Sequence, residues 1–259
     1  MSRPLLNPPC KGWKEDLPLP DTSNTTAPGL GYQSPNHQDM IYLEIARPLG
    51  GARELMLFFS FPMIIFTATL PLNIIQISEL LDSELILISV LLLAGGIWAS
   101  AFFIRISLSP PRDEPIRFNR KRKKIYAYNF KHCWWNPFGT WKVETVCYDW
   151  SQVRAERWFQ RGMLPNGVPI FKWGVMLSIV APGTNNVIDR FPLSTMGADQ
   201  HAWAYICTYM QHGPSALPPP GEPKNHNDVL WCELALRLAP KVEWPAEMDR
   251  ESRTASLGN

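Results

Sequence analysis

The sequence lacks the short motifs that identify many enzymes. It contains no GxSxG elbow, no phosphate-binding glycine loop and no HExxH zinc motif, and its five histidines are scattered. Carboxylates such as Glu144 and Asp149 have the positions of ordinary solvent-facing side chains on an alternating strand. These absences predict a protein that is not an enzyme and binds no cofactor.

Disulfide and metal frameworks are also missing. The five cysteines lie at wide spacing, with an odd total and no CxxC pair, which is typical of reduced thiols in the cytosol. His132 and Cys133 are neighbours in the chain, so their side chains diverge and predict no metal site. The opening segment MSRPLLNPPCKGWKEDLPLP has no apolar h-region, and no secretory signal peptide is expected.

The sequence does contain two long uncharged runs, residues 55–77 and 85–104. Each exceeds the roughly 18 apolar residues that mark a span, because about 20 helical residues cross a hydrocarbon core of about 30 Å. Only the segment SELLDSE separates them, so residues 51–108 are predicted to form an antiparallel transmembrane hairpin. Pro62 and Pro71 do not oppose this prediction, since membrane helices tolerate proline.

Charge predicts the orientation of the hairpin. The turn between the runs carries Glu79, Asp82 and Glu84 but no lysine or arginine, whereas Arg47 and Arg53 precede the first run and a basic cluster follows the second. Lysine and arginine accumulate on the cytoplasmic side of membrane proteins. We therefore expect both termini in the cytoplasm and the acidic turn outside.

The two ends of the chain are poor in apolar periodicity. Residues 1–50 are predicted to be a flexible cytosolic tail, with a lead-in over 39–50 that is either amphipathic or irregular. Trp13 is unusual in such a tail and suggests docking onto a folded domain. Residues 215–259 are expected to form a proline-rich linker, a short helix over 228–238 and a frayed terminus.

Residues 112–214 predict an antiparallel, β-rich cytosolic domain, because apolar and polar residues alternate in successive segments separated by turns. A helix over 196–212 follows, capped by Ser194 or Thr195 and ended at Gly213-Pro214. The predicted fold class is a membrane-anchored α+β protein, whose β-rich domain is similar to a pleckstrin-homology-like barrel closed by a C-terminal helix. The expected strands are two within 116–130, then 141–150, 153–162 (which also fits a helix), 169–180 and 187–193.

A basic cluster opens this domain, and three interpretations of it remain open. It determines topology, it contacts anionic lipid headgroups or a partner, or it contacts nucleic acid. The first two are favoured because the cluster begins close to the membrane exit and no nucleic-acid-reading module accompanies it. The predicted contact residues are Arg117, Arg120, Lys121, Arg122, Lys123 and Lys124.

Aromatic and acidic residues also suggest surfaces. Trp134, Trp135 and Trp141 are either core residues or an interfacial belt near the headgroups. An acidic surface for a basic partner is a weaker expectation, and it would comprise Glu144, Asp149, Glu156, Glu243, Glu247, Asp249 and Glu251.

Five segments together resemble a bacterial two-span family of unknown function, DUF6708. They are GWKEDLP, the hairpin of spans, RDEPIRFNRKRKKIYAY, VCYDWSQV and WAYICTYMQHGP. The resemblance implies a bacterial inner-membrane, multi-pass protein similar to the immunity or companion proteins encoded beside type VI secretion effectors. No catalytic residues are carried over from the family.

Two functions follow from this resemblance and from the absence of an active site. The first is an immunity-type protein whose cytosolic domain binds and neutralises a cognate toxin, such as a nuclease acting in the cytosol. The alternative is a membrane scaffold whose pleckstrin-like domain binds anionic lipid or an assembly partner. The expected partners are thus a toxin protein and the lipid bilayer, without direct nucleic acid.

Overall fold

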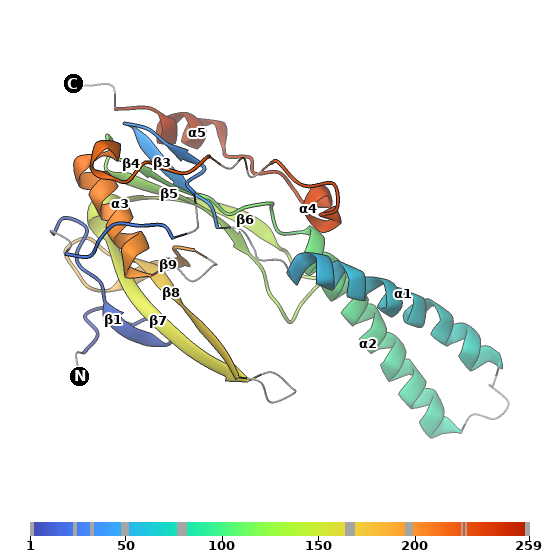
Figure 1. Ribbon diagram of the computed structural model, residues 1–259. Coiled ribbons are helices and arrows are strands. Elements are labelled where there is room, and N and C mark those ends of the chain that lie inside the picture. Colours follow the sequence, from blue (N-terminus) through green and yellow to red (C-terminus); the bar gives the residue numbers. More distant parts are fainter. Residues whose placement is uncertain are drawn as a thin grey trace.

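The structure, a computed structural model, describes residues 3–22, 25–31, 34–47, 52–76, 82–163, 169–194, 199–223, 225 and 227–256. A helical hairpin projects from one end of a domain built of two β-sheets (Figure 1). The hairpin comprises α1 (Ala52–Gln76) and α2 (Ser83–Leu108), which lie close to the predicted spans. Both helices are long and apolar enough to cross a membrane. Glu79 of the predicted acidic turn lies outside the described residues.

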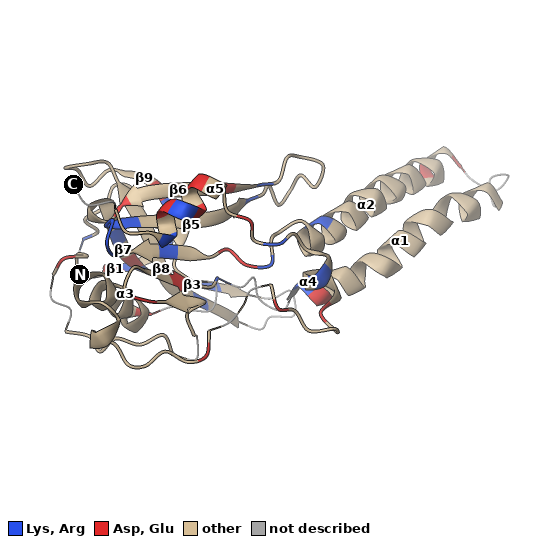
Figure 2. Cartoon of the chain, turned by 90° about the horizontal axis from the view of Figure 1, so that it is seen from above, with Lys and Arg blue, Asp and Glu red and all other residues tan. Residues whose placement is uncertain are grey.

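Small side chains bring α1 and α2 together. A Cβ on Gly96 of α2 would lie 2.5 Å from the Thr67 Oγ1 of α1, so only glycine fits this contact without a shift. A Cβ on the neighbouring Gly95 would meet nothing within 4 Å. Charged residues are confined to the helix ends in Figure 2, and the shafts between them are uncharged.

The domain contains a four-stranded sheet in the order β1-β7-β8-β9 and a five-stranded sheet in the order β2-β3-β4-β5-β6. All neighbouring strands within these sheets are antiparallel. The strands are β1 (Trp13–Asp16), β2 (His37–Gln38), β3 (Tyr42–Ile45), β4 (Ile116–Asn119), β5 (Lys124–Lys131), β6 (Lys142–Asp149), β7 (Val153–Met163), β8 (Pro169–Val180) and β9 (Val187–Pro192).

The helical hairpin is an insertion between two strands that pair with each other. Ile45 at the end of β3 lies opposite Ile116 at the start of β4, and the register continues to Tyr42 opposite Asn119. The chain therefore leaves the sheet and returns to it at one point. The transmembrane candidates are joined to the domain by two short connections rather than by one long linker.

The core lies between the two sheets and under α3 (Gln200–His212). Leu43, Phe118 and Ile125 from one sheet meet Leu177 from the other, and all are completely buried. Alternation of side chains along each strand supplies these inward positions. From α3, Trp203 joins this core and stacks obliquely on Trp150 at 5.5 Å between ring centroids.

The predicted strands after residue 112 agree with the structure, with differences at the ambiguous positions. Residues 153–163 form a strand rather than a helix, since β7 pairs along its whole length with β8. The helix α3 is capped by Asp199, which accepts hydrogen bonds from the amides of His201 and Ala202, and not by Ser194. Thr195 lies outside the described residues.

The prediction of a flexible N-terminal tail is corrected by the structure. β1 pairs with β7, with Trp13 opposite Trp158, and β3 occupies the segment expected to be a lead-in. The carbonyl of Pro18 accepts a hydrogen bond from Trp203 Nε1 at 2.9 Å, which fixes the connection between these strands against α3. These strands are too short to show a clear period in the sequence, and their stability comes from pairing with residues far along the chain.

The C-terminal segment also differs from its prediction. The helix expected over 228–238 is reduced to α4 (Leu234–Leu238), which packs beside the bases of α1 and α2. The residues expected to be frayed form α5 (Ala246–Arg253), which lies over the five-stranded sheet (Figure 1). The chain between α3 and α5 runs to the root of the helical hairpin and back.

Arg47 anchors the chain just before the hairpin. Its guanidinium is buried and donates to the carbonyls of Tyr128 on β5 (2.9 Å) and Pro192 on β9 (3.1 Å), so it joins the two sheets. Burial lowers the pKa of Arg47 to about 10, against the opposing effect of Glu114 and Asp113. The arginine therefore serves packing in addition to any role in orientation.

Candidate interaction surfaces

The predicted basic cluster occupies the end of β4 and its turn into β5, and most of its side chains are engaged within the protein. Arg117 is 1% exposed. Its Nε donates to Glu44, and its Nη1 donates to Asp249 (2.7 Å) and to Ser252 (2.8 Å). The Trp244 ring lies 4.5 Å from the guanidinium carbon. This arginine is thus a buried structural cation.

The remaining cations of the cluster hold two neighbouring segments. Arg120 and Lys123 donate to the carbonyls of Gln211 and Met210 at the end of α3. Arg122 donates to the carbonyls of Thr254 and Ala255 beyond α5. Lys124 forms an ion pair with Glu251 at 2.8 Å, and Lys121 is exposed.

The position of this turn bears on lipid contact. α3 and the C-terminus, which the turn contacts, lie at the end of the domain opposite the helical hairpin in both Figure 1 and Figure 2. If α1 and α2 cross a membrane, the turn points away from it. The prediction that these six residues contact headgroups or a partner stays a prediction, and the structure gives the headgroup alternative no geometric support.

Three of the acidic residues expected to form a surface are engaged within the protein, whereas Glu144, Asp149, Glu243 and Glu247 are exposed. Glu156 is completely buried, where it contacts Arg190 and accepts from the Ser178 hydroxyl and the Cys10 amide. Asp249 pairs with Arg117 and with Arg253. A hydrogen bond from Lys124 lowers the pKa of Glu251, and the same bond raises the pKa of Lys124. Asp249 and Glu251 thus fasten the C-terminal segment, whereas Glu156 joins the segment at Cys10 to β8 and β9.

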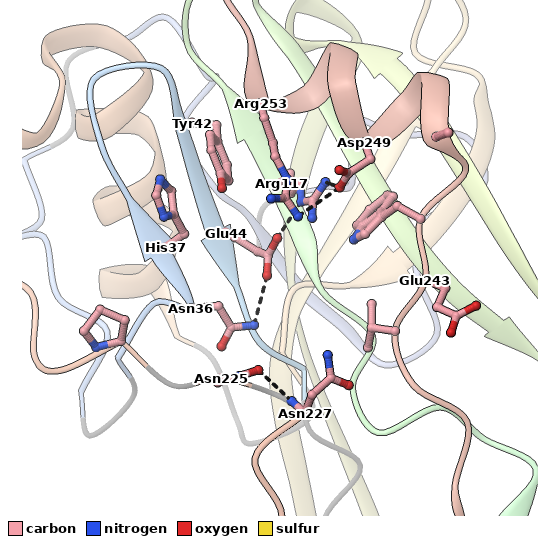
Figure 3. A pocket seen from close by; sticks show the side chains of 14 residues that line it. Asn36, His37, Tyr42, Glu44, Arg117, Asn225, Asn227, Glu243, Asp249 and Arg253 are labelled. Carbon is pink, nitrogen blue, oxygen red and sulfur yellow. Dashed lines mark hydrogen bonds and ion pairs between the residues drawn. The ribbon is translucent and has the colours of Figure 1, made fainter.

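A polar pocket of about 570 Å³ lies between the five-stranded sheet and the C-terminal segment (Figure 3). Glu44 and Arg117 point into it from β3 and β4, while Asp249 and Arg253 approach from α5. Each of the two carboxylates forms an ion pair with an arginine that lines the pocket. Among the described residues, no three His, Cys, Asp or Glu side chains are placed to hold a metal ion.

The outer halves of β7 and β8 form an arm that carries exposed aromatic residues. Trp173 and Phe171 are 52% and 50% exposed, and Met163 is 73% exposed. Phe159 stacks on Phe171 at 6.0 Å between ring centroids. Side chains alternate along paired strands, so these residues lie on the same face of the sheet as the residues that are buried in the core further along β7 and β8.

Cations border this aromatic face. Arg161 lies over the Phe159 ring at 5.6 Å, and Lys14 of β1 lies over the same ring at 5.5 Å. We call Lys14, Phe159, Arg161, Met163, Phe171 and Trp173 the arm face. The arm face was not predicted from the sequence, although the dense aromatic and basic content of residues 157–173 is a visible signal.

Comparison with known protein families identifies the family of this chain. DUF6708, described as a family of unknown function, matches residues 94–256, which is more than half of the chain. The chain is therefore a member of DUF6708. The search of curated proteins and the search of solved structures found no match.

Proposed function

We propose that this chain is an immunity-type protein of the bacterial inner membrane. In this proposal α1 and α2 span the membrane with both termini in the cytoplasm, and the β-rich domain binds and neutralises a cognate type VI secretion toxin. The toxin part rests on the resemblance to companion proteins of type VI effectors. The protein acts by binding, without catalysis of its own.

The arm face is the structural feature that best supports a binding function. Large exposed apolar side chains with a polar rim are typical of protein interfaces, and tryptophan, methionine and arginine are enriched at their centres. The two cations beside Phe159 favour a partner with an acidic surface. We therefore assign the toxin contact to the arm face rather than to the basic turn, the name we give to the predicted basic cluster from Arg117 to Lys124.

The strand order supports a pleckstrin-like architecture for the binding domain. Four consecutive strands, β3 to β6, belong to one sheet, three more, β7 to β9, belong to the other, and α3 follows. In this interpretation the transmembrane hairpin is inserted after the first strand of the domain. The alternative function, a lipid-binding scaffold, would use the basic turn.

Co-expression with a candidate toxin encoded by a neighbouring gene tests the proposal. The full chain should rescue the sensitised cell and should copurify with the toxin. The variant Phe171→Ser/Trp173→Ser should weaken binding at least about 30-fold, since losing a hot-spot contact costs about 2 kcal/mol or more. Rescue that survives this variant would remove the arm face from the proposal.

A charge-reversal pair separates the two surfaces. Arg161→Glu should weaken the toxin complex and its association rate, because it opposes an acidic partner. Lys121→Glu is the matched control, because this exposed lysine lies in the basic turn. If Lys121→Glu weakened the complex more than Arg161→Glu, the basic turn would be the contact surface instead. If the full chain gave neither rescue nor a complex, the immunity function would be refuted.

A further inference from the structure

Exposed apolar side chains surround the root of the helical hairpin. In the loop between β5 and β6, Trp134, Trp135 and Phe138 are 68%, 63% and 65% exposed. On the segment around α4, Trp231 is 83% exposed, and Leu234 and Leu238 are 47% and 60% exposed. We call these six residues the collar.

The loop half of the collar is fastened to α2. The indole Nε1 of Trp98 donates to the carbonyl of Trp135 at 3.3 Å. About two helical turns further along α2, Arg105 Nη1 donates to the carbonyls of Pro137 (2.5 Å) and Gly139 (2.7 Å). Trp98 and Arg105 are about 10 Å apart along the helix axis, at 1.5 Å per residue. The loop therefore lies along the C-terminal part of α2, the part nearest the domain.

The other half is fastened to both roots of the hairpin. Glu54 of α1 accepts hydrogen bonds from the amides of Ala235 (2.9 Å) and Leu236 (3.3 Å), which cap α4. Arg112, just beyond α2, donates to the carbonyls of Leu236 (3.1 Å) and Asn227 (2.9 Å). α4 therefore has a fixed position beside the helices.

Several backbone carbonyls of the loop accept hydrogen bonds from within the protein. The carbonyl of Asn136 accepts from Trp141 Nε1 (3.1 Å) and from the Gly139 amide (3.2 Å), and the carbonyl of Cys133 accepts from the Asn136 amide (3.1 Å). With the bonds from Trp98 and Arg105, the carbonyls of residues 133, 135, 136, 137 and 139 are all satisfied by protein groups. Irregular backbone at membrane depth requires such internal partners.

The sequence of the loop agrees with this placement. HCWWNPFGT, residues 132–140, contains no lysine, arginine, aspartate or glutamate. Lys131 and Lys142 pair directly at its base and are both exposed. Lysines beside an aromatic cluster reach anionic headgroups while tryptophans occupy the interface below them.

We propose that the collar is embedded in the headgroup–acyl interface of the bilayer. This inference rests on the proposed function, in that α1 and α2 cross that same bilayer. The collar lies beside the roots of the two apolar helices, so in this proposal the lipid that surrounds the helices also covers the collar. The β-rich domain is consequently held upright on the membrane in one orientation, with the basic turn directed into the cytoplasm.

Photo-crosslinking of the full chain to lipid tests the proposal. Benzoylphenylalanine replaces one residue at a time, at Trp134 and at Trp231, in protein reconstituted into phosphatidylcholine–phosphatidylglycerol vesicles. Leu87, an exposed residue of α2, reports on the membrane span, and Leu19, an exposed residue remote from the hairpin, reports background. Both collar positions should form lipid adducts several-fold above Leu19.

The reference positions separate the possible failures. Lipid adducts at Leu87 without adducts at Trp134 and Trp231 would overturn the collar and leave the membrane anchor standing. No adduct at Leu87 would overturn the anchor, and the collar with it. Adducts at a collar position and at Leu19 to equal extent would also refute a specific interfacial placement.

Discussion

Arg117 projects from β4 into the protein interior, where Glu44, Asp249 and Ser252 surround it. Replacing Arg117 with leucine would remove the cation that pairs with Glu44, a carboxylate that is 4% exposed. Breaking a buried pair in this way costs about 3–5 kcal/mol. We expect Arg117→Leu to lower the free energy of unfolding by that amount, measured by denaturant unfolding of the detergent-solubilised chain.

The control for this prediction is Lys121→Ala in the same turn. Lys121 is exposed, and substitutions at such sites usually change stability by less than about 0.5 kcal/mol. Equal stability of the two variants would show that Arg117 does not hold α5 against the sheet.

The ion pair of Lys124 with Glu251 stabilises the position of α5 only within a limited pH range. The pKa of Glu251 is lowered in the folded protein, so its contribution is present above the ordinary glutamate pKa and is lost as the pH falls through the folded value. The pKa of Lys124 is raised, so its contribution is present below the ordinary lysine pKa and is lost as the pH rises through the folded value.

Hydrogen exchange of α5 should therefore be slowest between roughly pH 5 and 10, after correction for the intrinsic rate, since the ordinary pKa values are about 4.3 and 10.4. The variant Lys124→Gln should flatten this profile while leaving α3 protected. A profile for α5 that is identical in the two proteins would contradict the prediction.

The sequence displays the charge of residues 117–124 but not its partners. Arg117 and Lys124 are neutralised by residues from β3 and α5, which are far away along the chain. Local patterns report periodicity and composition, whereas such pairings depend on how distant segments fold back. The pocket beside Arg117 was unpredictable for the same reason.

At the scale of elements, the two helices of the hairpin depend on the contact of Gly96 with Thr67. Gly96→Leu should force α1 and α2 apart and lower stability by about 1–3 kcal/mol, the usual cost of overpacking. Gly95→Leu is the matched control, because its added side chain meets open space. Thermal unfolding of both variants in detergent compares them.

A rescue makes this prediction more stringent. Thr67→Ala removes the side-chain oxygen that a Cβ at position 96 would approach. Combined with Gly96→Ala, it should recover part of the stability that Gly96→Ala alone loses. Additive effects of the two substitutions would mean that these residues do not touch.

Elements with strong local patterns were predictable, and those held by distant partners were not. The two uncharged runs and the alternation in β5, β6 and β8 correspond to observed elements. β1 and β3 were missed because short strands among prolines carry little periodicity, and their stability comes from pairing with β7 and β4. α5 was missed because it is polar and rests on ion pairs rather than on an apolar stripe.

At the scale of the whole molecule, insertion of the hairpin between paired strands couples the domain to the helices. β3 and β4 remain in register across the insertion, and Arg47 ties the exit point to both sheets. The domain should therefore not rotate freely about the helices. If α1 and α2 cross the membrane as proposed, the collar, the arm face and the basic turn keep fixed heights relative to it.

The topology of the two helices tests the central claim most directly. Single cysteines at Ser83 and at Ser256, compared with the unsubstituted chain, are treated with a membrane-impermeant maleimide in intact spheroplasts. The account predicts added modification of Ser83→Cys in intact cells, and of Ser256→Cys only after permeabilisation. Modification of Ser256→Cys from outside, or of neither position before permeabilisation, would contradict it.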